Sequence, residues 1–152
     1  MLTGNKGEWS EIYVLFRLLG DGKIYAADSE LNKLEDIYFP IIKIIREEAA
    51  GNLNEYFTGE TISIYINNVK VKDLPASRFV EEADLLFKEM INKKTKRSFE
   101  VKNTESFMEE IFCHKLAAPS TDKSDITMEI VDINTGYSPV VGFSIKSEIG
   151  NY

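Results

Sequence analysis

The stretch TISIYINNVKVK, residues 61–72, carries the clearest secondary-structure signal in this chain. Apolar and polar side chains alternate through residues 61–66, which is typical of a half-buried strand. Asn67 and Asn68 form a turn dipeptide, and the chain returns through residues 69–72. The stretch therefore predicts a β-hairpin, so the fold contains a sheet.

Helical periodicity is present on both sides of this hairpin, because apolar side chains recur three or four residues apart. The predicted helices cover residues 8–19, 79–90 and 104–116. Asn5 or Gly7 can begin the first helix, Ser77 can cap the second, and Pro119 stops the third. The chain therefore combines helices with a sheet.

Further strands are predicted where short apolar or alternating segments are bounded by turn residues. They cover residues 23–27, 38–46, 98–101, 125–130 and a segment from Val140. Pro40 leaves a helix as the alternative for the second of these segments. The last two segments pair as a hairpin around a turn at residues 134–136. The prediction is a single α+β domain spanning residues 1–152.

Composition removes several classes of function. The 152 residues are 43% apolar, which excludes a disordered chain, and the net charge of −7 argues against a freestanding nucleic-acid binder. Cys113 cannot pair within the chain and is predicted as a small buried thiol in a helix, which fits a reducing compartment such as the cytoplasm. Together with His114 it offers only two adjacent soft ligands, which argues against zinc.

No apolar run approaches the roughly 18 residues that a membrane span needs, so no membrane segment is predicted. Because the chain has only one Cys and one His, any catalysis has to be built from carboxylates, lysines and hydroxyl groups. That inventory favours metal-assisted chemistry on an anionic substrate.

One constellation fits such chemistry. Asp125 begins one strand of the last predicted hairpin, and Ser144, Ile145 and Lys146 lie in the other. The Asp125 carboxylate and the Ile145 carbonyl can give a divalent cation two oxygen ligands, with Lys146 projecting beside them. The alternative is a surface hairpin with a charged outer face.

Glu11 is the other candidate acid. It shares a face of the first helix with Leu15 and Leu18, so it is predicted to be a partly buried carboxylate that needs a cationic partner or a metal ion. Its alternative role is a salt bridge. Glu129 and Asp132 are predicted to be solvated, and the basic cluster at residues 93–97 to be a solvated helix end.

Four motifs add a resemblance to this pattern. They are NKGEWSE at residues 5–11, YFPIIKIIREE at 38–48, KSDI at 123–126 and GFSIKSEIG at 142–150. Together they resemble the HpaII family of type II restriction endonucleases, within the PD-(D/E)xK nuclease class. The resemblance implies a mixed β-sheet flanked by helices, a partial core of that class. It also implies Mg²⁺-dependent cleavage of double-stranded DNA at 5′-CCGG.

Transferred residue by residue, the resemblance makes Asp125 the first acid of the motif and Lys146 its lysine. Ser144 stands where the class usually has a second Asp or Glu, so one carboxylate of the metal site is missing. Glu11 is the favoured replacement, since class members often carry a glutamate on that helix, and Glu148 is the alternative. Asp125, Glu11 and the Ile145 carbonyl are thus the expected metal ligands.

The class core continues beyond the lysine strand, so the resemblance implies that residues 1–152 are the N-terminal catalytic portion of a longer endonuclease. Double-stranded DNA is the expected partner, and a homodimer is a candidate assembly. Two other hypotheses remain open. One is a catalytically inactive truncated module of the same fold, and the other is an unrelated α+β interaction domain with a charged hairpin.

Overall fold

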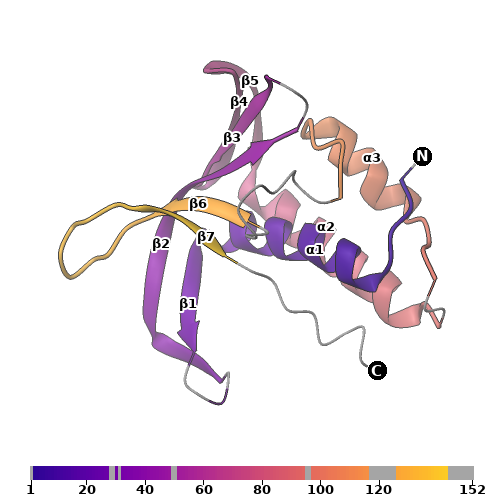
Figure 1. Cartoon of the computed structure of the whole chain (residues 1–152), viewed down its shortest axis with the longest axis horizontal. Coiled ribbons are helices and arrows are strands. Elements are labelled where there is room, and N and C mark those ends of the chain that lie inside the picture. Colours follow the sequence, from indigo (N-terminus) through magenta and orange to yellow (C-terminus); the bar gives the residue numbers. More distant parts are fainter. Residues whose placement is uncertain are drawn as a thin grey trace.

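The computed structural model describes residues 2–27, 30, 32–48, 51–94, 97–116 and 126–143 (Figure 1). In chain order its elements are α1 (Lys6–Asp21), β1 (Lys23–Ala27), β2 (Lys33–Glu47), β3 (Leu53–Phe57), β4 (Thr61–Ile66), β5 (Val69–Pro75), α2 (Ala76–Asn92), α3 (Lys102–Glu110), β6 (Ile126–Ile130) and β7 (Val140–Phe143). The predicted α+β class, with helices packed against a sheet, is confirmed.

Among the described residues the sheet has seven strands, in the order β5-β4-β3-β2-β6-β7, and β1 pairs with the first half of β2. The second half of β2 lies between β3 and β6, so this 15-residue strand connects both parts of the sheet. Every strand pair that the structure describes is antiparallel, unlike the mixed sheet expected from the resemblance. Short connections between most consecutive strands favour this pairing, because a tight turn joins only antiparallel neighbours.

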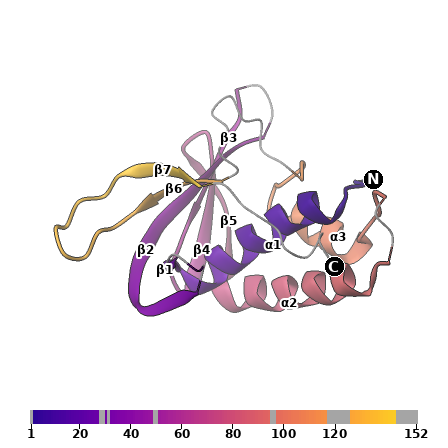
Figure 2. The same ribbon diagram turned by 60° about the horizontal axis from the view of Figure 1, so that its bottom comes forward.

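The three helices that the structure describes pack against one face of the sheet, which Figure 2 shows nearly edge-on. Phe16 of α1, Phe79 of α2 and Phe107 of α3 meet edge to face between the helices, with ring centroids 5.1–6.3 Å apart. Each such pair contributes about 0.5–1.5 kcal/mol beyond the burial of its area. From the sheet, the core receives the buried side chains of Ile44, Tyr56, Ile62, Ile64 and Met128.

Helix α1 is fixed at its start, its end and along its side. Asn5 caps it through a capping box with Glu8, in which each side chain accepts a hydrogen bond from the other residue's backbone N–H, at 2.9 and 3.2 Å. Gly22 ends the helix in the left-handed region, with φ of 71°. At Gly20 an added Cβ would lie 2.5 Å from Val80 Cγ2, so this glycine permits the close approach of α2.

Several predicted elements are confirmed. The helix over 8–19 is α1 with Asn5 as its N-cap, the helix over 79–90 is α2, and the hairpin at 61–72 is β4 and β5. Residues 38–46 form a strand, part of β2, which settles the alternative left open by Pro40. Strand β3 was not predicted, because residues 53–57 alternate only weakly.

Other predictions need correction. Ser77 does not cap α2, since Pro75 occupies the N-cap position and no side chain caps the helix. Residues 98–101 form only an isolated bridge, Phe99 to Gly4, instead of a strand. Helix α3 ends at Glu110 and not near residue 116, so buried Cys113 lies after the helix. Phe112, with φ of 61°, cannot continue a right-handed helix.

Candidate active site

Strands β6 and β7 form the hairpin on which the sequence places the candidate catalytic residues. The described register runs from Glu129 opposite Val140 to Ile126 opposite Phe143. Ile126, Met128 and Ile130 are buried against the core, whereas Thr127 and Glu129 are half-buried on the opposite face. The predicted hairpin is thus confirmed.

The candidate residues themselves adjoin this hairpin in the sequence. Asp125 directly precedes Ile126, and Ser144, Ile145 and Lys146 directly follow Phe143. These four candidates, like Glu148, lie outside the residues that the structure describes. Because Ile126 and Phe143 pair, the two strands end side by side at the points where the candidate segments begin.

The other end of the hairpin is a structured turn that points away from the helices (Figures 1 and 2). The Asp132 N–H donates to the Tyr137 carbonyl at 2.8 Å, and the Asp132 carbonyl accepts from Gly136 N–H at 2.7 Å. Its carboxylate Oδ1 accepts from Asn134 N–H at 3.0 Å. Asp132 was predicted to be solvated, but it is half-buried and shapes the turn. Glu129 is likewise half-buried, not fully solvated.

Glu11 is the one candidate acid that the structure describes. It lies on α1, and its side chain is half-buried, as predicted. Glu11 is not isolated, since it takes part in a polar or electrostatic interaction. Its assignment as a metal ligand stays a prediction, with the salt bridge as its alternative.

A buried polar network lies beside the start of β6 and was not anticipated. Arg46 Nε donates to Glu48 Oε1 at 2.7 Å, and both side chains are at most 5% exposed. Arg46 also donates to the Lys115 carbonyl, and Glu48 Oε2 accepts from His114 N–H at 3.3 Å. Arg46 is near the end of β2, and Glu48 directly follows the last residue of that strand.

Strand β3 completes this network. Asn54 Nδ2 donates to the Phe112 carbonyl at 2.7 Å, and the Tyr56 hydroxyl donates to the Ile111 carbonyl at 2.9 Å. Side chains of the sheet thus satisfy carbonyls that a longer α3 would have bonded internally, which explains why the helix ends early. The sequence signal for this network is polar side chains at positions that alternation assigns to the covered face.

A second unanticipated ion pair lies on the face of the sheet that the helices leave open. Lys43 Nζ is 2.5 Å from Glu55 Oε2 and 5.3 Å from the centroid of the Phe57 ring. Glu129 of β6 stands opposite Lys43 in the register. A strand-by-strand reading of alternation cannot find this pair, because it depends on which strands become neighbours.

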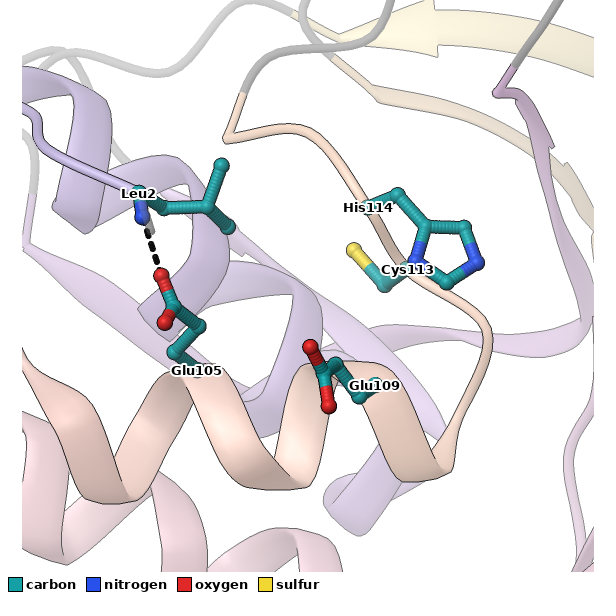
Figure 3. A pocket seen from close by; sticks show the side chains of 5 residues that line it. All are labelled: Leu2, Glu105, Glu109, Cys113 and His114. Atoms are coloured by element: carbon teal, nitrogen blue, oxygen red, sulfur yellow. Dashed lines mark hydrogen bonds between the residues drawn. The ribbon is translucent and has the colours of Figure 1, made fainter.

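A small cavity of about 130 Å³ lies between α3 and the segment that follows it (Figure 3). Leu2, Glu105, Glu109, Cys113 and His114 line it, and the Leu2 N–H donates to Glu105. Within the described part of the chain, no three His, Cys, Asp or Glu side chains are placed to hold a metal ion. The cavity therefore gives no support for a metal centre.

Comparison with known proteins decides the family. The model of the HpaII restriction endonuclease family matches residues 5–152. The chain belongs to the HpaII restriction endonuclease family. It is 40% identical over 151 residues to the "Type II restriction enzyme HpaII" of Haemophilus parainfluenzae, a match that covers 98% of this chain and 42% of that enzyme. No solved structure matches the chain.

Membership of the HpaII family confirms the resemblance carried by the four motifs and excludes the unrelated interaction domain. The family match includes both Glu11 and the segments around Asp125 and Lys146, since all lie within residues 5–152. The chain spans about 42% of the length of the curated relative. Among the described helices of this family member, none is long and apolar enough to cross a membrane.

Cys113 gives this HpaII family member a pH-dependent property that can be measured. Burial raises the pKa of the thiol from 9.0 to about 12. The folded state therefore favours the neutral thiol, so this contribution to stability is complete below pH 9 and is lost as pH rises toward 12. We expect the free energy of unfolding to fall between pH 9 and 11, and to fall less in Cys113→Ala. Urea titrations at several pH values measure this free energy. An equal decrease with pH in the wild type and in Cys113→Ala would contradict the prediction.

Proposed function

We propose that this chain is the catalytic portion of a Mg²⁺-dependent type II restriction endonuclease that cleaves double-stranded DNA at 5′-CCGG. The observation that carries the proposal is the 40% identity to a type II restriction enzyme across 98% of the chain. Because CCGG is its own reverse complement, a two-fold symmetric homodimer is the matching assembly. The chain spans only 42% of that relative, so we propose the cleavage activity, the CCGG specificity and the homodimer for the longer endonuclease of which this chain is a portion.

The proposed metal ligands are the carboxylates of Asp125 and Glu11 and the carbonyl of Ile145. All three are oxygen donors, the type that Mg²⁺ prefers. The half-burial of Glu11 on α1 is compatible with this role, because a carboxylate taken partly out of water needs a positive partner. Bound Mg²⁺ would stabilise negative charge that develops on the phosphoryl oxygens.

The proposed role of Lys146 is to orient the attacking water and to bind the phosphate through its positive charge. The water oxygen forms a bond to phosphorus, the bond from phosphorus to the 3′ oxygen breaks, and the products are a 5′-phosphate and a 3′-hydroxyl. Ser144, in the place of a second acid, offers a neutral hydroxyl, so Glu11 supplies the second negative charge. Glu148 is the alternative source of that charge.

The hairpin register supports bringing the acid and the lysine together. Ile126 and Phe143 are paired neighbours, and the two candidate segments join the sheet directly beyond them. The described β6 buries Ile126, Met128 and Ile130 and pairs with β2 as well as β7, so the sheet holds the two strand ends next to each other.

Metal binding tests the proposal without any requirement for cleavage. Millimolar Mg²⁺ or Mn²⁺ should raise the melting temperature of the chain, because a ligand that binds only the folded state stabilises it. A metal concentration 100 times the dissociation constant corresponds to about 2.7 kcal/mol. Asp125→Asn should erase the rise, and Asp132→Asn, a matched carboxylate at the far end of the hairpin, should keep it. No rise in the wild-type chain would favour an inactive module of the same fold.

A further inference from the structure

The hairpin of β1 and the first half of β2 extends beyond the rest of the sheet (Figure 1). Tyr25 and Tyr38 face each other across the two strands, with ring centroids 6.1 Å apart. Lys23 Nζ lies 5.2 Å from the centroid of the Tyr25 ring and 4.9 Å from that of Tyr38. Lys33 Nζ lies 3.9 Å from the Tyr25 centroid. We call these four residues the lysine–tyrosine face.

The two lysines of this face differ from most cations of the sheet. Lys43, Lys70 and Lys72 each form an ion pair with a carboxylate. Within the described part of the chain, Lys23 and Lys33 have aromatic rings as their partners and form no salt bridge with a carboxylate. The rings therefore hold both charges in place, and Asp21 acts on Lys23 only through a coulombic interaction without a salt bridge.

Lys23 also keeps its proton over the whole physiological range. A hydrogen bond to the Tyr25 hydroxyl, together with the partial negative charge there, raises the pKa of Lys23. Two ammonium groups held over one ring form a preorganised anion contact. In a chain with a net charge of −7, such a contact is distinctive.

We propose that the lysine–tyrosine face binds the phosphate backbone of duplex DNA that flanks the cleavage site. The proposal rests on the proposed nuclease function and adds to it a contact surface. A two-stranded β-ribbon is narrow enough to follow a DNA groove, and lysines that meet phosphates displace condensed counterions. The tyrosine rings keep both ammonium groups on one face, which lowers the entropy lost on binding.

Strand β2 sets the distance from this face to the candidate active site. Tyr38 is in the first half of β2, and Ile45, seven residues later, pairs with Thr127 next to the start of β6. At about 3.3 Å per residue, the extended strand places the two points about 23 Å apart. With 3.4 Å per base pair, the contact falls about seven base pairs from the cut.

Acidic residues on the same hairpin limit the strength of this contact. Asp36 and Glu30 are exposed there, and Glu30 is already engaged in an interaction. Asp36 would repel a nearby phosphate. Asp36→Asn is therefore expected to strengthen DNA binding, the opposite direction to loss of either lysine.

Binding to duplexes of two lengths tests the proposal. Duplexes with one central CCGG site carry either about three or about 12 flanking base pairs on each side, so that only the long one reaches the face. Dissociation constants of the complete gene product are measured at several salt concentrations, with Ca²⁺ in place of Mg²⁺ to suppress cleavage. The variants are Lys23→Gln/Lys33→Gln and the control Lys88→Gln, an exposed lysine of α2.

We expect the double variant to bind the long duplex more weakly and to lose about 0.9 of the logarithmic salt slope for each lysine. Its affinity for the short duplex should match that of the wild type, and Lys88→Gln should change neither value. The proposal would be overturned if the double variant bound the long duplex as tightly as the wild type does. It would also be overturned if the double variant lost the same affinity for both duplexes. A complete gene product that binds neither duplex would instead refute the proposed nuclease function.

Discussion

Asp125→Asn and Lys146→Gln should each reduce DNA cleavage by at least about 10²–10³-fold, the loss typical when a group that stabilises transition-state charge is removed. The first change removes a metal ligand while keeping the shape of the side chain, and the second removes the charge next to the phosphate. Cleavage of a duplex with one CCGG site, measured in the complete gene product, provides the rate. Melting temperatures provide the check that both variants fold.

The matched control for this experiment is Glu129→Gln. Glu129 lies on the same strand as the start of the candidate site and loses the same charge, but it faces Lys43 at the other end of β6. The Glu129→Gln variant should cleave the duplex at close to the wild-type rate. Undiminished cleavage by both Asp125→Asn and Lys146→Gln would remove these residues from the mechanism.

The same assay separates the two sources of the second negative charge. If Glu11 replaces the acid missing at Ser144, then Glu11→Gln should impair cleavage and weaken the response to Mg²⁺, whereas Glu148→Gln should not. The reverse result would transfer the role to Glu148. The nuclease assignment itself would stand in either case, because it depends on Asp125 and Lys146.

The second large effect is expected on stability. Removing one partner of the Arg46–Glu48 pair leaves the other charge buried, because neither side chain is more than 5% exposed. Such a loss costs about 3–5 kcal/mol. Arg46→Met should therefore lower the free energy of unfolding by that amount, and it also leaves the Lys115 carbonyl without its donor. Urea unfolding of the 152-residue chain measures the change.

Two comparisons sharpen this stability experiment. Arg46→Met/Glu48→Leu removes both charges, so it should recover much of the loss. Glu110→Gln breaks the pair of Glu110 with Arg78, in which the side chains are 30% and 36% exposed, and should cost less than about 1 kcal/mol. Equal losses from the buried and the exposed pair would contradict the role assigned to the Arg46–Glu48 pair.

Local patterns predicted those parts of the fold in which one segment determines its own structure. Helix α1 carries its periodicity and its Asn5 cap within about 20 residues, and the hairpin of β4 and β5 carries its own turn. Such features are readable because each depends on neighbours in the sequence. The hairpin of β6 and β7 was predicted for the same reason.

Features that depend on distant partners were missed or misplaced. The third helix was predicted to run to residue 116, because nothing local shows that Tyr56 and Asn54 bind the carbonyls after Glu110. Arg46 and Glu48 look like surface charges at the end of an apolar strand until α3 and its following segment cover them. Family resemblance added what spacing could not, namely the chemical roles of Asp125 and Lys146.

The most direct test of the account is cleavage of a duplex that contains one CCGG site, by this 152-residue chain and by the complete gene product. Each is assayed with Mg²⁺ and with a chelator, next to a duplex in which one base pair of the site is changed. We expect Mg²⁺-dependent cleavage of the CCGG duplex alone by the complete product, and cleavage by the 152-residue chain would localise specificity within it. Failure of both proteins to cut the CCGG duplex, or equal cutting with the chelator, would contradict the account.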